Sequence, residues 1–260
     1  MGTVILFLLI LWLLGIAGTM IRYGNFTIEK RQNELFIKRG LLETKELTIP
    51  YHRIQAIGVE QSIIRQPFGY VRLFAVVAGG SFDQLETFPV LFPLMRREEI
   101  ADFLRTFLPE YAGFSDVTLQ PLPKRSLFFY LSKTVLLPLI LLIVSVIYFM
   151  KFIWIPIILV IISLFFGYMR FKDVGYHLRE QFFTLQFRRF QKTLIMTQKN
   201  RIQSITKSKH RLQAWSKIAS IHLSLIGSFG LGTHYVLRHL DYENALSIAT
   251  WFSYRKQEHK

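Results

Sequence analysis

The stretch Arg53-Ile54-Gln55-Ala56-Ile57 returns almost unchanged as Arg201-Ile202-Gln203-Ser204-Ile205, 148 residues further along the chain. The same offset places Leu35-Phe36-Ile37 over Phe183-Thr184-Leu185 without a gap. A constant register with hydrophobic alternation on both sides indicates an internal repeat. We therefore expect two copies of one folded unit, and we expect the strands of that unit to decide the fold.

Each copy is rich in short segments typical of β-strands, because apolar and polar residues alternate between turn residues such as glycine. The predicted strands are Glu34–Arg39, Glu46–Pro50, Ala56–Glu60 and Val71–Val77 in the first copy, and Phe182–Arg188, Thr193–Met196, Arg201–Thr206 and Ile218–Ile226 in the second. An amphipathic helix follows in each copy, over Arg96–Leu108 and Asp241–Phe252. This pattern predicts small antiparallel barrels or sandwiches, each capped by a C-terminal helix.

Three further segments are apolar enough to cross a bilayer, which takes about 20 residues of helix. The first spans residues 1–21 and is uncharged from Thr3 to Ile21. It lacks the basic start of a signal peptide, and Arg22 follows in place of a cleavage site. The other two form a predicted transmembrane hairpin over residues 127–169, divided by Lys151. The folded units then occupy residues 22–115 and 170–258.

Positive charge lies on one side of all three predicted spans. The cations on that side are Arg22, Lys30, Arg31, Lys124, Arg125, Lys133, Arg170 and Lys172, whereas the hairpin turn carries Lys151. The positive-inside rule therefore places both folded units in the cytoplasm and the N-terminus outside. The first span has no partner helix before it, which is the pattern of a chain that starts midway through a second hairpin.

The motifs of the first copy resemble the bacterial pleckstrin-homology (PH) domain. They are Gly40-Leu41-Leu42, Ile49 to Gln55, Gln61 to Arg65, Phe68-Gly69-Tyr70 and Gly79-Gly80. The alternation of such domains with membrane spans is similar to that of the multi-pass membrane proteins of the YdbT type. The signature positions are Gly40, Pro50, Arg53, Gln55, Arg65, Gly69, Arg201 and Gln203. The second copy departs from the pattern, with Gln198 where the first has Pro50 and Trp215-Ser216 where it has Pro67-Phe68.

The resemblance implies a membrane protein with α-helical spans and two β-rich PH-like barrels, each a bent barrel of seven strands capped by a C-terminal helix. It implies a binding or scaffolding role at the bacterial cell membrane, beside a smaller companion PH-domain protein. The chain could form a homo- or hetero-oligomer. Similar proteins are linked to resistance against membrane-active antimicrobial peptides, including bacteriocins. The alternative function is an accessory subunit of a peptide exporter.

Charge is distributed unevenly between the two copies. Residues 22–126 hold 14 Lys and Arg against 12 Asp and Glu, whereas residues 170–260 hold 16 against 5. A basic surface tethered beside anionic lipid gains about 1 kcal/mol for each cation that reaches it. We therefore predict anionic-lipid contacts from Arg188, Arg189, Lys192, Lys199, Lys207, Lys209 and Arg211. The same cations could form an ordinary solvated face; a nucleic-acid surface is disfavoured because no recognition motif accompanies them.

Few residues in the sequence suggest catalysis or a cofactor. The chain has no cysteine, and none of its seven histidines stands in a zinc-binding pattern. No Gly-x-Ser-x-Gly nucleophile motif is present. The repeated Arg-Ile-Gln, flanked by apolar residues, is interpreted as a structural element that fixes a turn or bulge. We accordingly predict a protein that is not an enzyme and needs neither metal nor cofactor.

Overall fold

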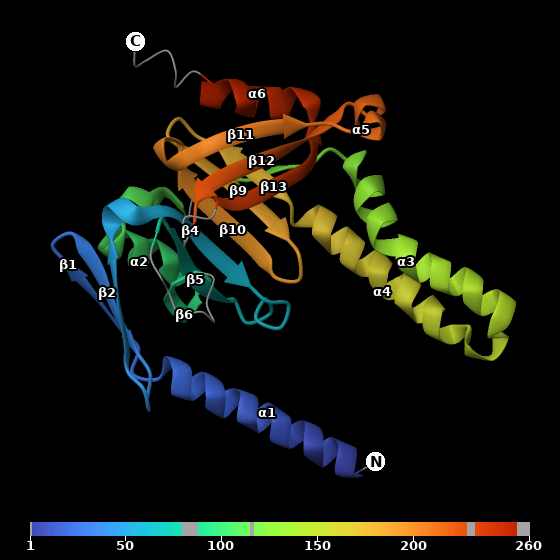
Figure 1. Cartoon of the computed structure of the whole chain (residues 1–260), viewed down its shortest axis with the longest axis horizontal. Coiled ribbons are helices and arrows are strands. Elements are labelled where there is room, and N and C mark those ends of the chain that lie inside the picture. The colour runs from blue at the N-terminus through green and yellow to red at the C-terminus, as the bar shows by residue number, and fades with distance from the viewer. Residues whose placement is uncertain (1, 80–87, 115–116, 228–231, 254–260) are drawn as a thin grey trace.

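The computed structural model describes residues 2–79, 88–114, 117–227 and 232–253 (Figure 1). The first half contains α1 (Gly2–Tyr23), β1 (Thr27–Arg31), β2 (Glu34–Arg39), β3 (Lys45–Pro50), η1 (Tyr51–Arg53), β4 (Ile54–Gln61), β5 (Tyr70–Val77), β6 (Val90–Arg96), η2 (Arg97–Glu99), α2 (Ile100–Phe107) and η3 (Pro109–Phe114). The link consists of β7 (Gln120–Pro121), α3 (Ser126–Tyr148) and η4 (Met150–Phe152). The second half contains α4 (Trp154–Lys172), β8 (Gly175–Leu178), β9 (Phe182–Arg188), β10 (Lys192–Gln198), η5 (Lys199–Arg201), β11 (Ile202–Ser208), α5 (Arg211–Trp215), β12 (Ile218–Ile226), β13 (Gly232–Asp241) and α6 (Tyr242–Ser253).

The repeat seen in the sequence is also a repeat of structure. The offset of 148 residues superposes η1 on η5 end to end, β2 on β9 and β4 on β11. It also places α1 on α4, so that each repeat consists of an apolar helix followed by its strands. All eight predicted strands are present, and the predicted helix over Arg96–Leu108 is the 3₁₀ turn η2 followed by α2.

The strands within the described residues form three antiparallel sheets, and the largest joins the two copies. Its order is β6-β5-β4-β10-β9-β8-β7, flanked by the separate sheets β1-β2-β3 and β11-β12-β13. We call the β4–β10 pairing the seam; its register runs from Gln61 opposite Lys192 to Ala56 opposite Thr197. The predicted strand-rich units are present, but their sheets do not close into barrels. Each copy divides into two sheets, because β4 pairs on one edge with β5 of its own copy and on the other edge with β10 of the second copy.

The seam lies between two hydrophobic cores and contributes to both. Ile57 and Val59 of β4 belong to the core of the first copy, whereas Ala56 belongs to that of the second. Conversely, Met196 of β10, a strand of the second copy, packs in the core of the first copy. Since successive side chains of a strand point to opposite faces, one strand can supply two cores. The buried Thr197 hydroxyl donates to the Gln55 carbonyl at 2.8 Å and fixes the register.

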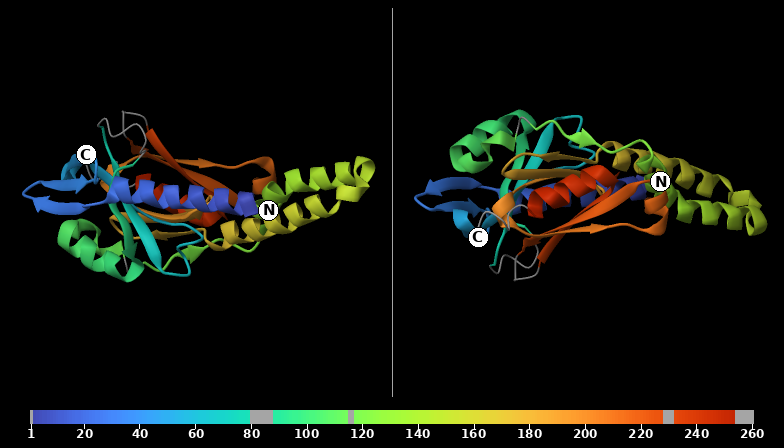
Figure 2. Two further views of the ribbon diagram at one scale, coloured as in Figure 1. Left: turned by 90° about the horizontal axis from the view of Figure 1, so that it is seen from below. Right: turned by 90° about the horizontal axis from the view of Figure 1, so that it is seen from above.

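Helices α3 and α4 form a hairpin that projects from one end of the molecule, while the β1–β2 ribbon projects from the other (Figure 2). Helices α1, α3 and α4 are, within the described residues, the three that are long and apolar enough to cross a membrane. The base of the hairpin is fixed to the second copy, because Arg125 pairs with Asp241 and the Ser126 hydroxyl donates to the His239 carbonyl. Over residues 2–23, α1 buries none of its side chains.

Candidate functional site

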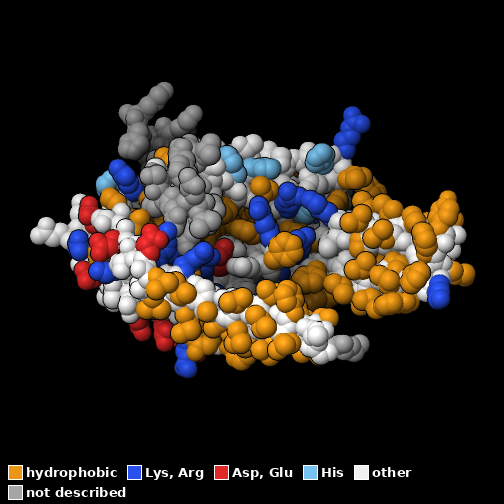
Figure 3. All heavy atoms as spheres, turned by 60° about the horizontal axis from the view of Figure 1, so that its bottom comes forward, with side chains coloured by type: hydrophobic (Ala, Val, Ile, Leu, Met, Phe, Trp, Pro, Cys, Tyr) orange, Lys and Arg blue, Asp and Glu red, His pale blue; other side chains and the backbone are white. Residues whose placement is uncertain are grey.

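A cleft of about 370 Å³ lies where the hairpin meets the second copy, and we call it the base cleft. The hairpin helices, the β9–β10 turn and β13 all contribute to it. Its lining residues are Phe129, Tyr130, Lys133, Thr134, Arg170, Val174, Phe187, Arg188, Arg189, Phe190, Tyr235, Val236, Arg238 and His239. The volume falls within the ~300–1,000 Å³ typical of ligand pockets. Figure 3 shows lysine and arginine side chains gathered beside the apolar hairpin.

The base cleft is lined by cations, and none of the described residues in its lining is acidic. Lys133 and Arg170 come from the ends of the two spans, Arg189 comes from the β9–β10 turn, and Arg238 comes from β13. Arg170 also donates from Nε to the Arg189 carbonyl at 3.2 Å, which ties the end of α4 to the β9–β10 turn. Arginine binds phosphate and carboxylate oxygens in a bidentate manner, so the cleft suits an anion.

Arg188 has a different role from its neighbour Arg189. Its side chain is 1% exposed and its Nε pairs with the Asp173 carboxylate. The other carboxylate oxygen of Asp173 lies 3.6 Å from Lys192 Nζ. Arg188 therefore lies against the cleft with its charge paired to Asp173, and the cations left for a ligand are Lys133, Arg170, Arg189 and Arg238.

The Tyr235 hydroxyl is a buried polar group that lacks a hydrogen-bond partner among the described residues. The residue is 8% exposed and lines the base cleft. Burial raises the pKa of Tyr235, with a smaller contribution from Glu60, so the phenol keeps its proton and can donate. A buried donor without a partner is costly, and a bound anion would satisfy it.

Aromatic rings around His239 form another part of the cleft lining. Its ring stacks on Phe129 with centroids 5.0 Å apart and meets Tyr130 edge-on at 5.3 Å. The Gln213 amide holds Nδ1 at 2.9 Å. Burial, followed by the charges of Arg238 and Lys133, lowers the pKa of His239 to about 4. This residue is therefore neutral at physiological pH and forms part of an apolar wall.

An apolar groove of about 270 Å³ continues from the base cleft along the spans, and we call it the hairpin groove. The two share Thr134, Arg170, Arg189 and Phe190. The groove then follows α3 and α4 past Pro138, Leu159, Ile162, Ser163 and Phe166. The cationic base cleft therefore leads directly into the apolar hairpin groove.

Comparison with known proteins agrees with this architecture. A family model described as "Bacterial PH domain" matches residues 1–110 and 126–256. The chain belongs to the bacterial PH-domain family. It is 34% identical over 253 residues to the "UPF0699 transmembrane protein YdbT" of Bacillus subtilis (strain 168). That alignment covers 96% of this chain and 51% of the relative, so the chain spans about half the length of the curated relative it matches. The resemblance drawn from the motifs is confirmed, as is a membrane protein with two PH-domain repeats.

The cations predicted to contact lipid are distributed over several places in this PH-domain protein. Arg188 and Arg189 line the base cleft. Lys199 lies over the Trp251 ring, and both Lys207 and Lys209 lie over the ring of Tyr242 at the start of α6. The two remaining residues are Lys192, beside Asp173, and the exposed Arg211 of α5. The structure brings two of the seven into the cleft.

Three cleft cations, Lys133, Arg170 and Arg238, were not among the predicted contacts. Lys133 and Arg170 mark the ends of spans, where their charge predicted only the orientation of the helices. Arg238 lies in β13, which packs near α3, a helix about a hundred residues earlier in the chain. Flanking charge was the available signal for the first two, whereas nothing in the sequence singles out Arg238.

The signature residues of the family take structural positions. Gly40 and Gly69 have positive φ of 112° and 71°, and Pro50 ends β3 before the turn η1. Gln55 and Gln203 lie in equivalent irregularities of the β4–β5 and β11–β12 pairings, where a residue is skipped.

The remaining signature residues are arginines near turns. Arg201 Nη1 donates to the His52 carbonyl at 2.7 Å, so this arginine joins the two copies. Arg53, its counterpart in the first copy, accepts a bond on its carbonyl from the Ala78 amide at 2.8 Å. Arg65 lies in the turn after β4, where its amide bonds the Ser62 carbonyl.

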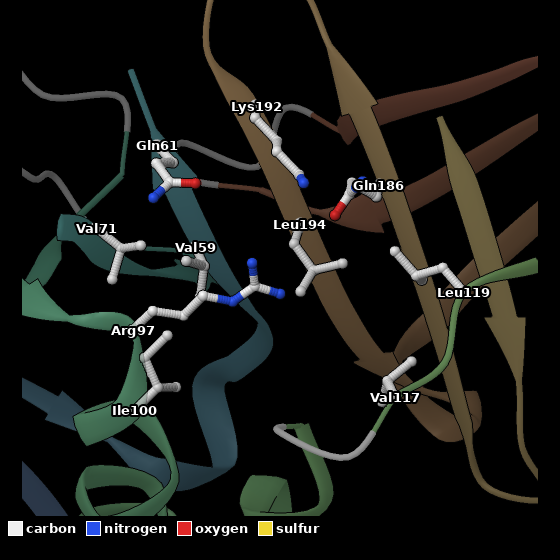
Figure 4. A pocket seen from close by; sticks show the side chains of 10 residues that line it. All are labelled: Val59, Gln61, Val71, Arg97, Ile100, Val117, Leu119, Gln186, Lys192 and Leu194. Atoms are coloured by element: carbon white, nitrogen blue, oxygen red, sulfur yellow. The ribbon is translucent and has the colours of Figure 1, made fainter. Parts of the chain in front are cut away.

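A smaller pocket of about 100 Å³ lies at the seam (Figure 4). Arg97 comes from the first copy and extends between the apolar side chains of Val59 and Leu194, whereas Lys192 of the second copy reaches the pocket beside Gln186. This volume is below the ~300–1,000 Å³ of most ligand pockets. No group of three or more potential metal ligands occurs in the parts of the chain that the structure describes. The base cleft is therefore the leading candidate site.

Proposed function

We propose that this chain is a membrane-anchored binding protein whose base cleft holds the headgroup of an anionic lipid. The observation that carries the proposal is the continuity of the cationic base cleft with the apolar hairpin groove, through Arg170, Arg189 and Phe190. An amphipathic ligand with a negative end and an acyl chain matches both parts. Tyr235 would donate its free hydroxyl to the phosphate.

The proposed mechanism is positioning rather than catalysis. The hairpin fixes the height of the second PH domain, and the lipid bridges hairpin and domain at their junction. We propose that the domains lie on the cytoplasmic leaflet, since the flanking cations lie at that end of the spans. Each cation that contacts lipid phosphate contributes about 1 kcal/mol.

Two charge-matched double variants test the cleft in the purified full chain. Arg189→Ser with Arg238→Ser removes two cleft cations, whereas Lys207→Ser with Lys209→Ser removes two cations near α6. By native mass spectrometry with added phosphatidylglycerol, we expect the cleft variant to bind about thirty-fold more weakly, from a loss of about 2 kcal/mol. We expect the control to stay within about twofold. Equal losses in both variants, or equal binding of phosphatidylcholine, would contradict a specific anion site.

Tyr235→Phe provides a finer test that leaves the charge unchanged. A hydrogen bond to a charged group contributes about 1.5–3 kcal/mol, so phosphatidylglycerol binding should weaken about tenfold or more. Thermal stability of the lipid-free variant should not fall, because the hydroxyl has no partner among the described residues. Unchanged lipid binding would remove the tyrosine from the site.

We propose that the cellular role is protection of the envelope against membrane-active antimicrobial peptides. The support is the family resemblance together with the proposed anionic-lipid site, because cationic peptides are attracted to the same lipids. A deletion strain should be more susceptible to such a peptide, and the Arg189→Ser, Arg238→Ser double variant should restore less resistance than the wild type. Unaltered susceptibility of the deletion strain would contradict this role.

A further inference from the structure

The seam joins two kinds of strand edge that every repeat possesses. β4 supplies one edge from the first copy, and β10 supplies the other from the second. β10 is the repeat counterpart of β3, and β11 is the repeat counterpart of β4. The seam thus uses one edge of β4 and one edge of β10. The equivalent edges of their counterparts, β11 and β3, remain.

The remaining edges are unpaired in the part of the chain that the structure describes. There, β3 pairs with β2 and β11 with β12. Burial reflects the difference between counterparts: residues 55–59 of β4 are buried, whereas Gln203, Ser204 and Thr206 of β11 are exposed. On β3, Glu46 and Thr48 are exposed, while their counterparts in the seam, Leu194 and Met196, pack in the first core. An open edge offers backbone groups to another strand.

We propose that β11 of one chain pairs with β3 of a second copy of this chain, repeating the seam between molecules. Transferring the seam register by the repeat offset places Lys207 opposite Glu46 and Ile205 opposite Thr48. The first of these pairs is oppositely charged. Within one chain, Glu46 already lies 3.2 Å from Lys38 on the solvent face. In the proposed contact, Lys207 of the neighbouring chain is a second cation beside Glu46.

The assembly is compatible with the spans. The operation that carries the first copy onto the second also carries α1 onto α4, and both helices run in the same direction along the molecule (Figures 1 and 2). Placing a second chain by the same superposition therefore keeps its apolar helices on the same side of the assembly as those of the first chain. Because the contact uses different edges on the two partners, it can continue from chain to chain into a row, which stays open or closes into a ring according to the rotation between neighbours.

The contact between chains is weaker than the seam. Ser204 and Thr206 stand where the seam has Ala56 and Gly58, so fewer apolar side chains are buried. Confinement to a membrane raises the effective concentration of chains and favours such a contact. The row should therefore form in membranes at high density and dissociate on dilution in detergent.

Cysteine cross-linking tests this directly, because the chain has no cysteine of its own. Two differently tagged full-length chains, one with Thr48→Cys and one with Ile205→Cys, are expressed together in membranes and mildly oxidised. We expect a disulfide-linked pair carrying both tags. Ser204→Cys in place of Ile205→Cys is the control for register, since it shifts the cysteine to the other face of the strand and should give several-fold less product.

The alternatives have distinct outcomes. Cross-linking of either variant with itself would show a two-fold contact and overturn the proposal. A chain carrying both cysteines that forms only an internal disulfide would show that β3 and β11 meet within one molecule, which also overturns it. Glu46→Lys in the Thr48→Cys chain should reduce the mixed product several-fold. Adding Lys207→Glu to the Ile205→Cys chain should restore it, and failure of this restoration would contradict the proposed register.

Discussion

At the scale of single residues, adjacent cations of the same type have opposite roles. Arg188 and Arg189 are neighbours at the end of β9, yet the first is buried against Asp173 and the second is exposed in the cleft. The basic stretch could be recognised from the sequence. Which arginine faces inward could not, because it depends on Asp173, fifteen residues earlier, reaching the same place after the end of α4.

Asp173 should be important for stability, because it neutralises Arg188 and lies beside Lys192. Replacing it with alanine leaves a buried guanidinium without its partner, which typically costs about 3–5 kcal/mol. We expect Asp173→Ala to lower the Tm of the purified chain clearly. The double variant Asp173→Ala, Arg188→Met removes both charges and should recover much of the loss. A double variant as unstable as the single one would show that Asp173 acts through another contact.

His239 should make stability depend on pH. Its pKa in the folded protein is about 4, below the ordinary value of 6.5, since burial disfavours the charged ring. The unfolded chain therefore binds a proton first, and this contribution to stability is complete above about pH 6.5 and decreases as the pH falls toward 4. His239→Asn tolerates the positive φ of 60° at this position. Between pH 7 and 5, the Tm of the wild type should fall more than that of this variant, and equal falls would contradict the assignment.

At the scale of elements, the strands could be predicted but their partners could not. Alternation and turn residues locate β2, β5, β9 and β12, because those signals are local. The seam brings together residues more than a hundred positions apart, and periodicity is silent about such pairing. Residues 56–59 gave one indication of this pairing, since four consecutive apolar or small residues indicate a strand covered on both faces.

Gly58 should be indispensable to the seam. A Cβ atom there would lie 2.1 Å from Cζ of Phe74, a ring that is buried in the second core. Overpacking of a core usually costs about 1–3 kcal/mol, so Gly58→Ala should lower the Tm of the chain. Thr206→Ala, at the counterpart position on exposed β11, is the matched control and should have little effect. Similar effects of both substitutions would indicate that the seam is not closely packed.

At the scale of the whole molecule, the sequence was sufficient for the three apolar helices and for the two repeats. The expected barrels failed because closure depends on which edges pair, and here the copies pair with each other. The base cleft needs α3, the end of α4 and β13 to meet. Only the folded chain brings together Lys133, Arg170 and Arg238, so a basic stretch of sequence could point to lipid without locating the site.

The orientation of the molecule in the membrane can be tested with single cysteines, one in the hairpin turn and one in a PH domain. With the domains in the cytoplasm, Lys151→Cys should react with a membrane-impermeant maleimide added to intact cells, and Glu180→Cys should react only after the cells are opened. Both positions are exposed in the folded chain, so a difference in labelling reports the side of the membrane rather than burial. The reverse pattern would place the base cleft at the outer leaflet, where the positive-inside distribution of charge would be violated and the proposed site would face a different set of lipids.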